Sequence, residues 1–332
     1  MGLLSISTSF SLTTNPHNIP KYNNPEMNYS TDDLVPSGKG TPNWDKTPIK
    51  RVNTTPNLSK SVLNGATIIP QYGIYFHGGA VLGATINPAT KLTQYITPQL
   101  YVIYYGNYTT SSLNKYNMYT INHFLSILGG SHFYKILTTY RNKNGSAIPN
   151  SIHFGKAIID NYSYGKNLSD DNVWAVVNRA INRGLLPKNK NGIYLVLTSA
   201  DVNETSGFCT EYCGWHDGRL MGSTPLQFGF IGDPARCPDS CQDYTSGTPH
   251  KASTDSMIST ISHEIFEAVS DPQLNAWYDK QGEENGDLCA WSYGKIYTTA
   301  AYKYNLTLGT DHYLVQQEWL NVGPSGRCAI SY

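Results

Sequence analysis

One stretch of this chain, residues 255 to 271, spaces its apolar and polar residues with the period of an α-helix. At 100° per residue, its two sides differ in character. One side is apolar and carries Ile258, Ile261, Ile265, Ala268 and Val269. The opposite side is polar and carries Ser256, Ser259, Thr260, His263, Glu267 and Ser270. The pattern predicts an amphipathic helix with one packed face and one face directed into a polar site.

Short apolar runs separated by Gly and Asn turns surround this helix. They predict strands at residues 66–79, 99–106, 151–159, 192–202, 226–232 and 313–321. Helical patterns cover residues 113–130, 132–140 and 171–187, the last with Ser169 or Asp170 as its N-cap and Gly184 near its end. The cysteine-containing segments around residues 203–225 and 233–254 are expected to be loops. Alternating strands and helices predict an α/β sheet with helices laid across it.

The first 65 residues differ from the remainder. Residues 15 to 65 are rich in Asn, Pro, Ser, Thr and Lys and show no periodicity, so residues 1–65 are expected to be a flexible arm or pro-segment. Lys50-Arg51 is either a processing site or two exposed basic residues. The chain begins with MGLLSISTSFSLTT, which lacks the basic start and long apolar core of a signal peptide. Residues 66–332 are then expected to form one α/β domain.

Composition narrows the classes of partner. Charged residues make up 14% of the 332 residues and the formal net charge is zero, which disfavours binding to nucleic acid or an anionic membrane. No run of apolar residues is long enough to span a bilayer. The 25 tyrosines permit a polysaccharide-binding module, although core packing explains them as well.

Six cysteines and nine Asn-x-Ser/Thr sequons favour an oxidising compartment, and hence a secreted, disulfide-bonded glycoprotein. The first four are Cys209, Cys213, Cys237 and Cys241, whose spacing also nearly fits a structural zinc site with four thiolates. Their pairing is open, because four cysteines allow three connectivities. If they pair among themselves, Cys289 and Cys328 are the remaining pair.

The candidate chemistry lies in the spacing of His263, Glu264 and Glu267. In the HExxH zinc signature, two ligands stand one helical turn apart and the Glu after the first His is the general base. A carboxylate is an acceptable zinc ligand, so HExxE keeps the same reach with less specificity. A solvated helix face with an isolated His would give the same letters. Against that alternative, no Lys or Arg within a turn balances the two Glu.

His77-Gly78-Gly79 has the letters of an esterase oxyanion-hole turn. That chemistry needs a G-x-S-x-G nucleophile turn, which the sequence lacks, so these residues are expected to form a turn at a strand end.

Five segments, in order, resemble the exordium-like family of plants, also called the phosphate-induced protein family: YFHGGAVL, YVIYYGNY, FLSILGG, VLTSADVNETSGFCTEYCGWH and FGFIGDPARCPDSCQ. The resemblance implies an extracellular, wall-associated protein linked to growth control, with no established enzymatic role. Where plant members carry an apolar helix without His, this chain has HEIFEAVSDP, and so looks more like microbial relatives with an HExxE helix. Shared elements of that branch are His263, Glu264, Glu267, Asp271, Pro272, Trp277, Asp279, Gly282, Glu284, Asp287, Cys289, Val315, Gln316, Trp319, Asn321 and Cys328.

That likeness to zinc peptidases implies a third ligand. Asp271 lies two turns beyond His263, about 12 Å along the axis, and reaches a shared ion only if the helix breaks before Pro272. Glu284 and Asp287 follow a chain reversal and resemble a ligand delivered from a later segment, with Asp287 slightly preferred. A calcium site, or a turn held by side-chain caps, is the alternative for this loop. A Cys289–Cys328 bridge would tie the loop to the C-terminal strands.

Two functions follow from these observations. The first is a secreted zincin-like α/β domain in which zinc, held by His263, Glu267 and a third carboxylate, activates water for peptide-bond hydrolysis with Glu264 as general base. Its partner would be a peptide or protein. The second is a non-catalytic extracellular protein in cell-wall or growth-related signalling, with a cell-wall component as its partner.

Overall fold

The computed structural model describes residues 34–39, 73–87, 89–90, 92–243, 246–323 and 326–332. Its centre is a five-stranded sheet in the order β5-β4-β7-β10-β9. The strands are β4 (Gln99–Tyr105), β5 (His153–Asp160), β7 (Gly192–Thr198), β9 (Gly214–Met221) and β10 (Thr224–Ile231). Neighbouring strands run parallel except β9, which pairs antiparallel with β10 at the edge. The predicted α/β sheet is confirmed, and it is mixed.

Strand β9 lies within residues 203–225, where the sequence predicts a loop, so that prediction is wrong for this segment. Its residues GWHDGRLM include two glycines and several polar side chains, a composition with low intrinsic preference for strands. The strand forms because all eight residues, from Gly214 to Met221, pair with β10 across a tight turn. Pairing with a neighbour, rather than local propensity, therefore decides this element.

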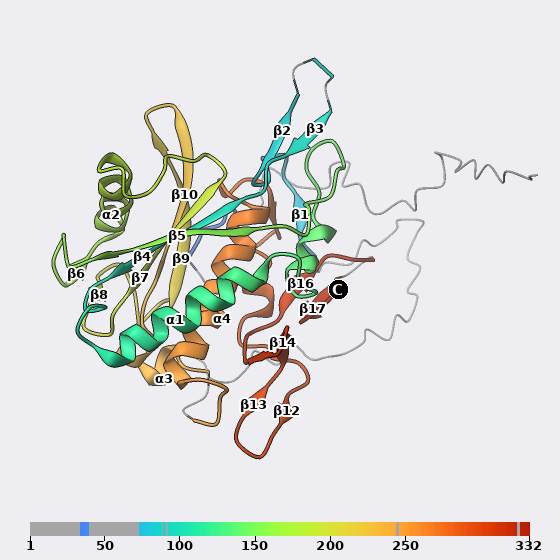
Figure 1. Cartoon of the computed structure of the whole chain (residues 1–332). Helices are drawn as coiled ribbons and strands as arrows, with labels where there is room; N and C mark the ends of the chain where they lie inside the picture. Colours follow the sequence, from blue (N-terminus) through green and yellow to red (C-terminus); the bar gives the residue numbers. More distant parts are fainter. Residues whose placement is uncertain (1–33, 40–72, 88, 91, 244–245, 324–325) are drawn as a thin grey trace, which may run out of the picture.

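Helices cover both faces of the sheet (Figure 1). Helices α1 (Ser112–Leu128) and α4 (Ala252–Ser270) share one core with inward residues of β4 and β7, such as Val102 and Leu195. Helix α2 (Asp170–Asn182) packs on the other face against alternate residues of the same strands, such as Ile103 and Val196. The alternation follows from the strand period of two. Consequently β7 is buried along its whole length.

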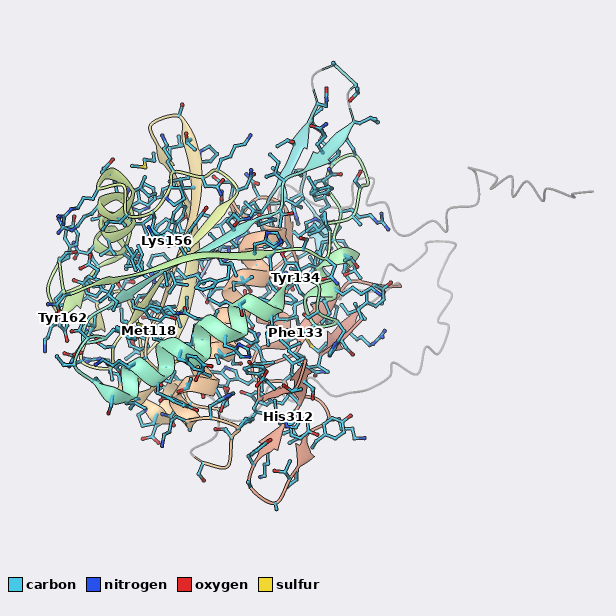
Figure 2. All side chains as sticks on the ribbon, viewed as in Figure 1. Met118, Phe133, Tyr134, Lys156, Tyr162 and His312 are labelled. Atoms are coloured by element: carbon cyan, nitrogen blue, oxygen red, sulfur yellow. A yellow bond between two sulfur atoms is a disulfide. The ribbon has the colours of Figure 1, made fainter. Side chains whose placement is uncertain are left out.

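The predicted helices are confirmed, with local reasons for their ends. The Ser169 side chain accepts a hydrogen bond from the Asn172 backbone N–H, and the Asn172 side chain bonds back to the Ser169 N–H, a reciprocal cap. Gly184 adopts a positive φ of 66° just beyond the end of α2, where glycine is favoured. Residues 132–140 form the 3₁₀ helix η1 (Tyr134–Thr139) rather than an α-helix. Phe133 and Tyr134 at its start, labelled in Figure 2, pack against Phe266 of α4.

The remaining elements are short. They are β1 (Tyr75–Phe76), β2 (Ala84–Ile86), β3 (Thr93–Tyr95), β6 (Asn167–Leu168), β8 (Asn203–Glu204), β11 (Trp277–Tyr278), β12 (Tyr297–Thr298), β13 (Lys303–Tyr304), β14 (Leu306–Leu308), β15 (Asp311–Tyr313), β16 (Glu318–Leu320), β17 (Arg327–Ala329), α3 (Pro238–Cys241), η2 (Pro234–Arg236) and η3 (Asp287–Cys289). Of the strand expected at 66–79, residues 73–79 are described and contain β1. The expected C-terminal strand is divided between β15 and β16.

The turn at His77 is confirmed as a strand end. Its backbone N–H donates to the Ala276 carbonyl at 2.6 Å, and its ring stacks on Tyr278 at 3.5 Å. Gly79 lies so close to Asn275 that a Cβ would fall 2.5 Å from the Asn275 carbonyl oxygen. Close backbone approach explains this glycine.

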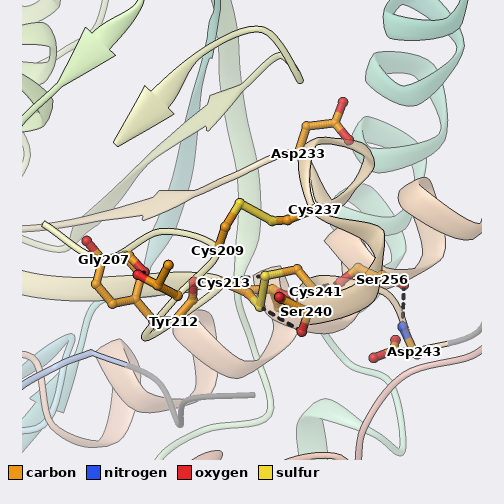
Figure 3. Close-up of a disulfide and its surroundings, with 12 residues drawn as sticks. Gly207, Cys209, Tyr212, Cys213, Asp233, Cys237, Ser240, Cys241, Asp243 and Ser256 are labelled. Atoms are coloured by element: carbon orange, nitrogen blue, oxygen red, sulfur yellow. Dashed lines mark hydrogen bonds between the residues drawn. A yellow bond between two sulfur atoms is a disulfide. The ribbon is translucent and has the colours of Figure 1, made fainter. Parts of the chain in front are cut away.

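All six cysteines form disulfides, which excludes a four-thiolate zinc site. The bridges are Cys209–Cys237, Cys213–Cys241 and Cys289–Cys328. The first two lie side by side and tie the loop before β9 to α3 (Figure 3). The first four cysteines therefore pair first with third and second with fourth, one of the three connectivities that the sequence left open.

Most of the predicted arm, residues 1–33 and 40–65, lies outside the described residues. Its residues 34–39 are described and lie along the free edge of β9. The His216 N–H donates to the Gly38 carbonyl at 2.8 Å, and Lys39 forms an antiparallel bridge with Trp215. Lys39 Nζ lies 3.1 Å from Asp170 Oδ2. Within the described part of the chain, no helix is long and apolar enough to cross a membrane.

Candidate metal centre

Helix α4 is buried on both its apolar and its polar side. His263 is 5% exposed, and Glu264 and Glu267 are each 1% exposed. The alternative of a solvated helix face is therefore wrong. Two buried serines on the helix are satisfied by carbonyls one turn back: Ser262 Oγ donates to Ile258 O at 2.9 Å, and Ser270 Oγ donates to Phe266 O at 3.0 Å. The Glu264 carboxylate has no such local solution.

The first group of donor atoms centres on His263. Its Nε2 lies 3.1 Å from Glu267 Oε1 and 3.4 Å from Asp287 Oδ1. One ligand atom from each of these three residues lies within 4.8 Å of the others. The structure thus brings together the imidazole and the two carboxylates that the sequence analysis puts on one ion.

Backbone contacts hold Asp287 in place. Its N–H donates to Glu267 Oε1 at 3.1 Å, and its Oδ2 accepts from the Glu284 N–H at 3.1 Å.

The loop that carries Asp287 is also tied to later segments of the chain. The Gln316 amide donates to the Gly286 carbonyl at 3.1 Å and lies 2.9 Å from His263 Nδ1. The Cys289–Cys328 bridge anchors the end of η3 to β17. The loop is therefore held from several directions.

A second group centres on His216 of β9, which the sequence analysis does not select. His216 Nδ1 lies 3.4 Å from Glu264 Oε2 and 3.4 Å from Glu267 Oε2. Its Nε2 lies 3.7 Å from Glu284 Oε1. Because Trp215 faces the α2 core, His216 points to the opposite face, toward α4. The available signal was its position at the end of the motif CTEYCGWH, three residues after Cys213.

The remaining candidates occupy other places. Asp271 is in neither group. The helix ends at Ser270, and Asp271 Oδ1 accepts from the N–H groups of Asn275 and Ala276 at 2.6 and 2.7 Å. Glu284 approaches His216 rather than His263. That His263, Glu267 and a third carboxylate bind a metal ion stays a prediction.

A divalent ion fits these donors. His263 Nε2, both nitrogens of His216 and both oxygens of Glu264 are buried without a hydrogen-bond partner in the described structure. Such orphaned polar atoms cost free energy unless something binds them. Imidazole nitrogen with carboxylate oxygen is a donor set for zinc and similar ions.

The charges in the site influence one another. Burial raises the pKa of Glu264 to about 7. Burial also opposes ionisation of Glu267, but the charges of His263 and His216 outweigh it and lower the pKa of Glu267 to about 2. Burial raises the pKa of Glu284 well above its usual range. Negative charge is thus concentrated on Glu267, the carboxylate that the His263 group and the His216 group share.

Access to the site is narrow. A cavity of about 30 Å³ reaches it, lined in part by Gly214, Thr260, His263, Glu264 and Trp291. A space of that size holds one or two water molecules. His263 and Glu264 therefore face a space of solvent size.

Fold and site together define a class: a disulfide-bonded α/β protein with a buried histidine–carboxylate centre between α4 and the edge strand β9. The model of one protein family, described as "Phosphate-induced protein 1 conserved region", matches residues 75–313 of this chain. The chain therefore belongs to the phosphate-induced protein family, as the resemblance indicated.

Two relatives from Arabidopsis thaliana carry the name EXORDIUM-like. This chain is 30% identical to Protein EXORDIUM-like 3 over 274 residues, covering 70% of this chain and 78% of the relative. It is 29% identical to Protein EXORDIUM-like 5 over 228 residues, covering 59% of this chain and 61% of that relative. No solved structure matches the chain.

Proposed function

We propose that this chain acts outside the cell as a non-catalytic protein of the exordium-like type, in wall-associated or growth-related signalling. Family membership supports the role, and three disulfides support an oxidising location. The observation that carries the non-catalytic part is the closure of the site, because Glu264 is 1% exposed behind a cavity of about 30 Å³.

In this proposal the buried centre holds a divalent metal ion as part of the fold. His263 Nε2, Glu267 Oε1 and Asp287 Oδ1 would supply the donors. An ion shared by α4 and η3 would fix the loop at residues 284–289 and satisfy atoms that are otherwise orphaned. Zinc is the expected ion, since its sites use this mixture of nitrogen and oxygen donors.

A zinc peptidase is the second candidate, favoured by one observation: Glu264 lines the same cavity as His263. A bound zinc ion supplies Lewis acidity that makes a coordinated water easier to deprotonate. Glu264 would take the proton of that water and pass it to the leaving amine. A zincin-like fold belongs to this candidate and is supported by the mixed sheet, whose antiparallel edge strand β9 lies against the HExxE helix.

The test combines metal analysis with peptide hydrolysis. The purified wild type, Glu264→Gln and the exposed control Glu211→Gln are analysed for metal by mass spectrometry and incubated with a broad peptide library. We expect bound metal and no cleavage by any of the three proteins. Cleavage by the wild type and by Glu211→Gln that disappears in Glu264→Gln would establish the peptidase instead. A wild type without metal, and unable to take up zinc, would overturn the metal centre.

A further inference from the structure

Glu267 belongs to both groups of donor atoms, and each of its oxygens faces a different imidazole. Oε1 lies 3.1 Å from His263 Nε2, and Oε2 lies 3.4 Å from His216 Nδ1. We propose that the cluster is a two-metal centre, in which Glu267 bridges the ion at His263 and Asp287 to a second ion held by His216 and Glu264. The inference rests on the metal centre of the proposed function and extends it. Carboxylate-rich two-metal sites hold their ions about 3.5–4 Å apart.

The spacing of the donors in the second group fits a shared ion. Two ligand atoms at about 2.0–2.1 Å from one tetrahedral zinc lie about 3.3 Å from each other. His216 Nδ1 is 3.4 Å from Glu264 Oε2 and 3.4 Å from Glu267 Oε2. Direct N–H···O hydrogen bonds would be about 2.7–3.2 Å long. Both nitrogen–oxygen distances therefore fit two ligands of one ion better than a direct hydrogen bond.

Unpartnered buried atoms point to the same place independently of that spacing. His216 is 0% exposed and neither of its ring nitrogens has a hydrogen-bond partner in the described structure. Both oxygens of Glu264 are orphaned in the same way, at 1% exposure. Burying an imidazole and a carboxylate in this state is costly unless a ligand binds them. An ion between them would satisfy both.

The number of donors favours two ions over one. In the described structure, four carboxylates have an oxygen within 4.0 Å of an imidazole nitrogen of the cluster: Glu264, Glu267, Glu284 and Asp287. Together with His263 and His216 they make six donor side chains, whereas one tetrahedral zinc ion takes four ligands. The cluster therefore has donors for a second ion.

The donors also indicate the class of ion. His216 with two carboxylates is a nitrogen and oxygen set, suited to zinc or to manganese, with no sulfur donor to select softer ions. Glu264 would then be a ligand rather than a free base, which agrees with a non-catalytic site.

Zinc stoichiometry tests the proposal. Metal-free wild type, His216→Asn and Asp287→Asn are titrated with Zn²⁺ by calorimetry and analysed for metal after dialysis. The control is His123→Asn, a half-buried histidine that pairs with Asp311 away from the cluster. We expect two ions per chain in the wild type and in the control, and one in each of the other variants. One ion in the wild type, with the same value in His216→Asn, would overturn the second site while leaving the first in place. No ion in the wild type would overturn the metal centre of the proposed function as well.

A second measurement covers the case in which His216→Asn does not fold. Glu264→Gln keeps the size of the side chain, and we expect it to bind one ion. Wild type loaded with two Mn²⁺ per chain should give the electron paramagnetic resonance signal of a spin-coupled pair, because the bridging carboxylate holds the ions close together. Glu264→Gln loaded with Mn²⁺ should give the six-line signal of an isolated ion. A six-line signal from the loaded wild type would contradict the bridge.

Discussion

The backbone of Gly286 packs directly against the ring of His263. A Cβ placed on Gly286 would lie 2.7 Å from both Cγ and Nδ1 of that ring, and 2.9 Å from Glu267 Oε1. Real Cβ atoms do not approach so closely, so only glycine fits here. Through this contact the loop that carries Asp287 sets the position of the first two donors on α4.

Replacing Gly286 by Ala should therefore damage the metal centre without removing a ligand. The added methyl group must displace the His263 ring or the loop, and a shift of about 1 Å is large for a metal site. We expect zinc affinity to fall by at least about tenfold, as for loss of outer contacts to a ligand, measured by competition with a chromogenic chelator. Gly145→Ala, where a Cβ meets nothing within 4 Å, is the control and should bind as wild type.

Metal removal should lower thermal stability. An ion that binds only the folded state at a thousand times its dissociation constant contributes about 4 kcal/mol. We expect the wild type to unfold several degrees lower after treatment with a chelator, and to recover with Zn²⁺, followed by circular dichroism. An identical melting temperature with and without chelator, in protein shown to carry metal, would speak against a role for the ion in folding.

The two neighbouring disulfides should not contribute independently. Cys209–Cys237 and Cys213–Cys241 each join residues 28 apart, and either one already holds the two segments together. Loss of one bridge should cost about 2–3 kcal/mol, and loss of both about 6 kcal/mol, in the loop-entropy account. Urea unfolding of the Cys209→Ser/Cys237→Ser variant and of the fourfold variant measures this. A single-bridge variant as unstable as the fourfold one would show that the account is wrong.

Asp233 should make stability depend on pH. Burial raises its pKa from 3.8 to about 6, while its Oδ1 accepts from the Ala235 N–H at 2.9 Å. The folded state therefore holds the proton more tightly than the unfolded state. Its contribution is fully present below about pH 4 and is lost as pH rises through about 6.

Asp233→Asn keeps the acceptor oxygen and removes the titration. Relative to the wild type, the variant should gain about 3 kcal/mol of unfolding free energy between pH 4 and pH 7. Urea unfolding at several pH values provides the measurement. A constant difference across that range would mean that Asp233 does not carry a raised pKa.

Gly38 should hold the 34–39 segment against β9. It has a φ of +67°, and a Cβ would lie 2.1 Å from the His216 carbonyl oxygen. Gly38→Ala should lift the segment and speed hydrogen exchange at the His216 N–H, which donates to the Gly38 carbonyl. Gly165→Ala carries the same backbone strain, at φ +77°, with nothing within 4 Å of its Cβ. Exchange at His216 should be unchanged in that control.

The sequence by itself determined the elements whose signals are local. The periodicity of α4, the Ser169 cap of α2 and the apolar runs of β4 and β7 each depend on neighbours a few residues away, and the structure has them as expected. Local patterns also placed His263 and Glu267 one turn apart, because helix geometry alone sets that distance. The even cysteine count likewise indicated disulfides.

Only the tertiary structure decided which distant residues meet that helix. Strand β9 exists because it pairs with β10, and its alternation then turns His216 toward Glu264 and Glu267. The order of the disulfides and the approach of Gly286 to His263 likewise join segments separated by more than twenty residues. Such contacts carry no local period, because they arise from packing between elements. Hence the sequence alone named the donors on α4 and the candidate carboxylates after it, and the fold added His216 and chose among those carboxylates.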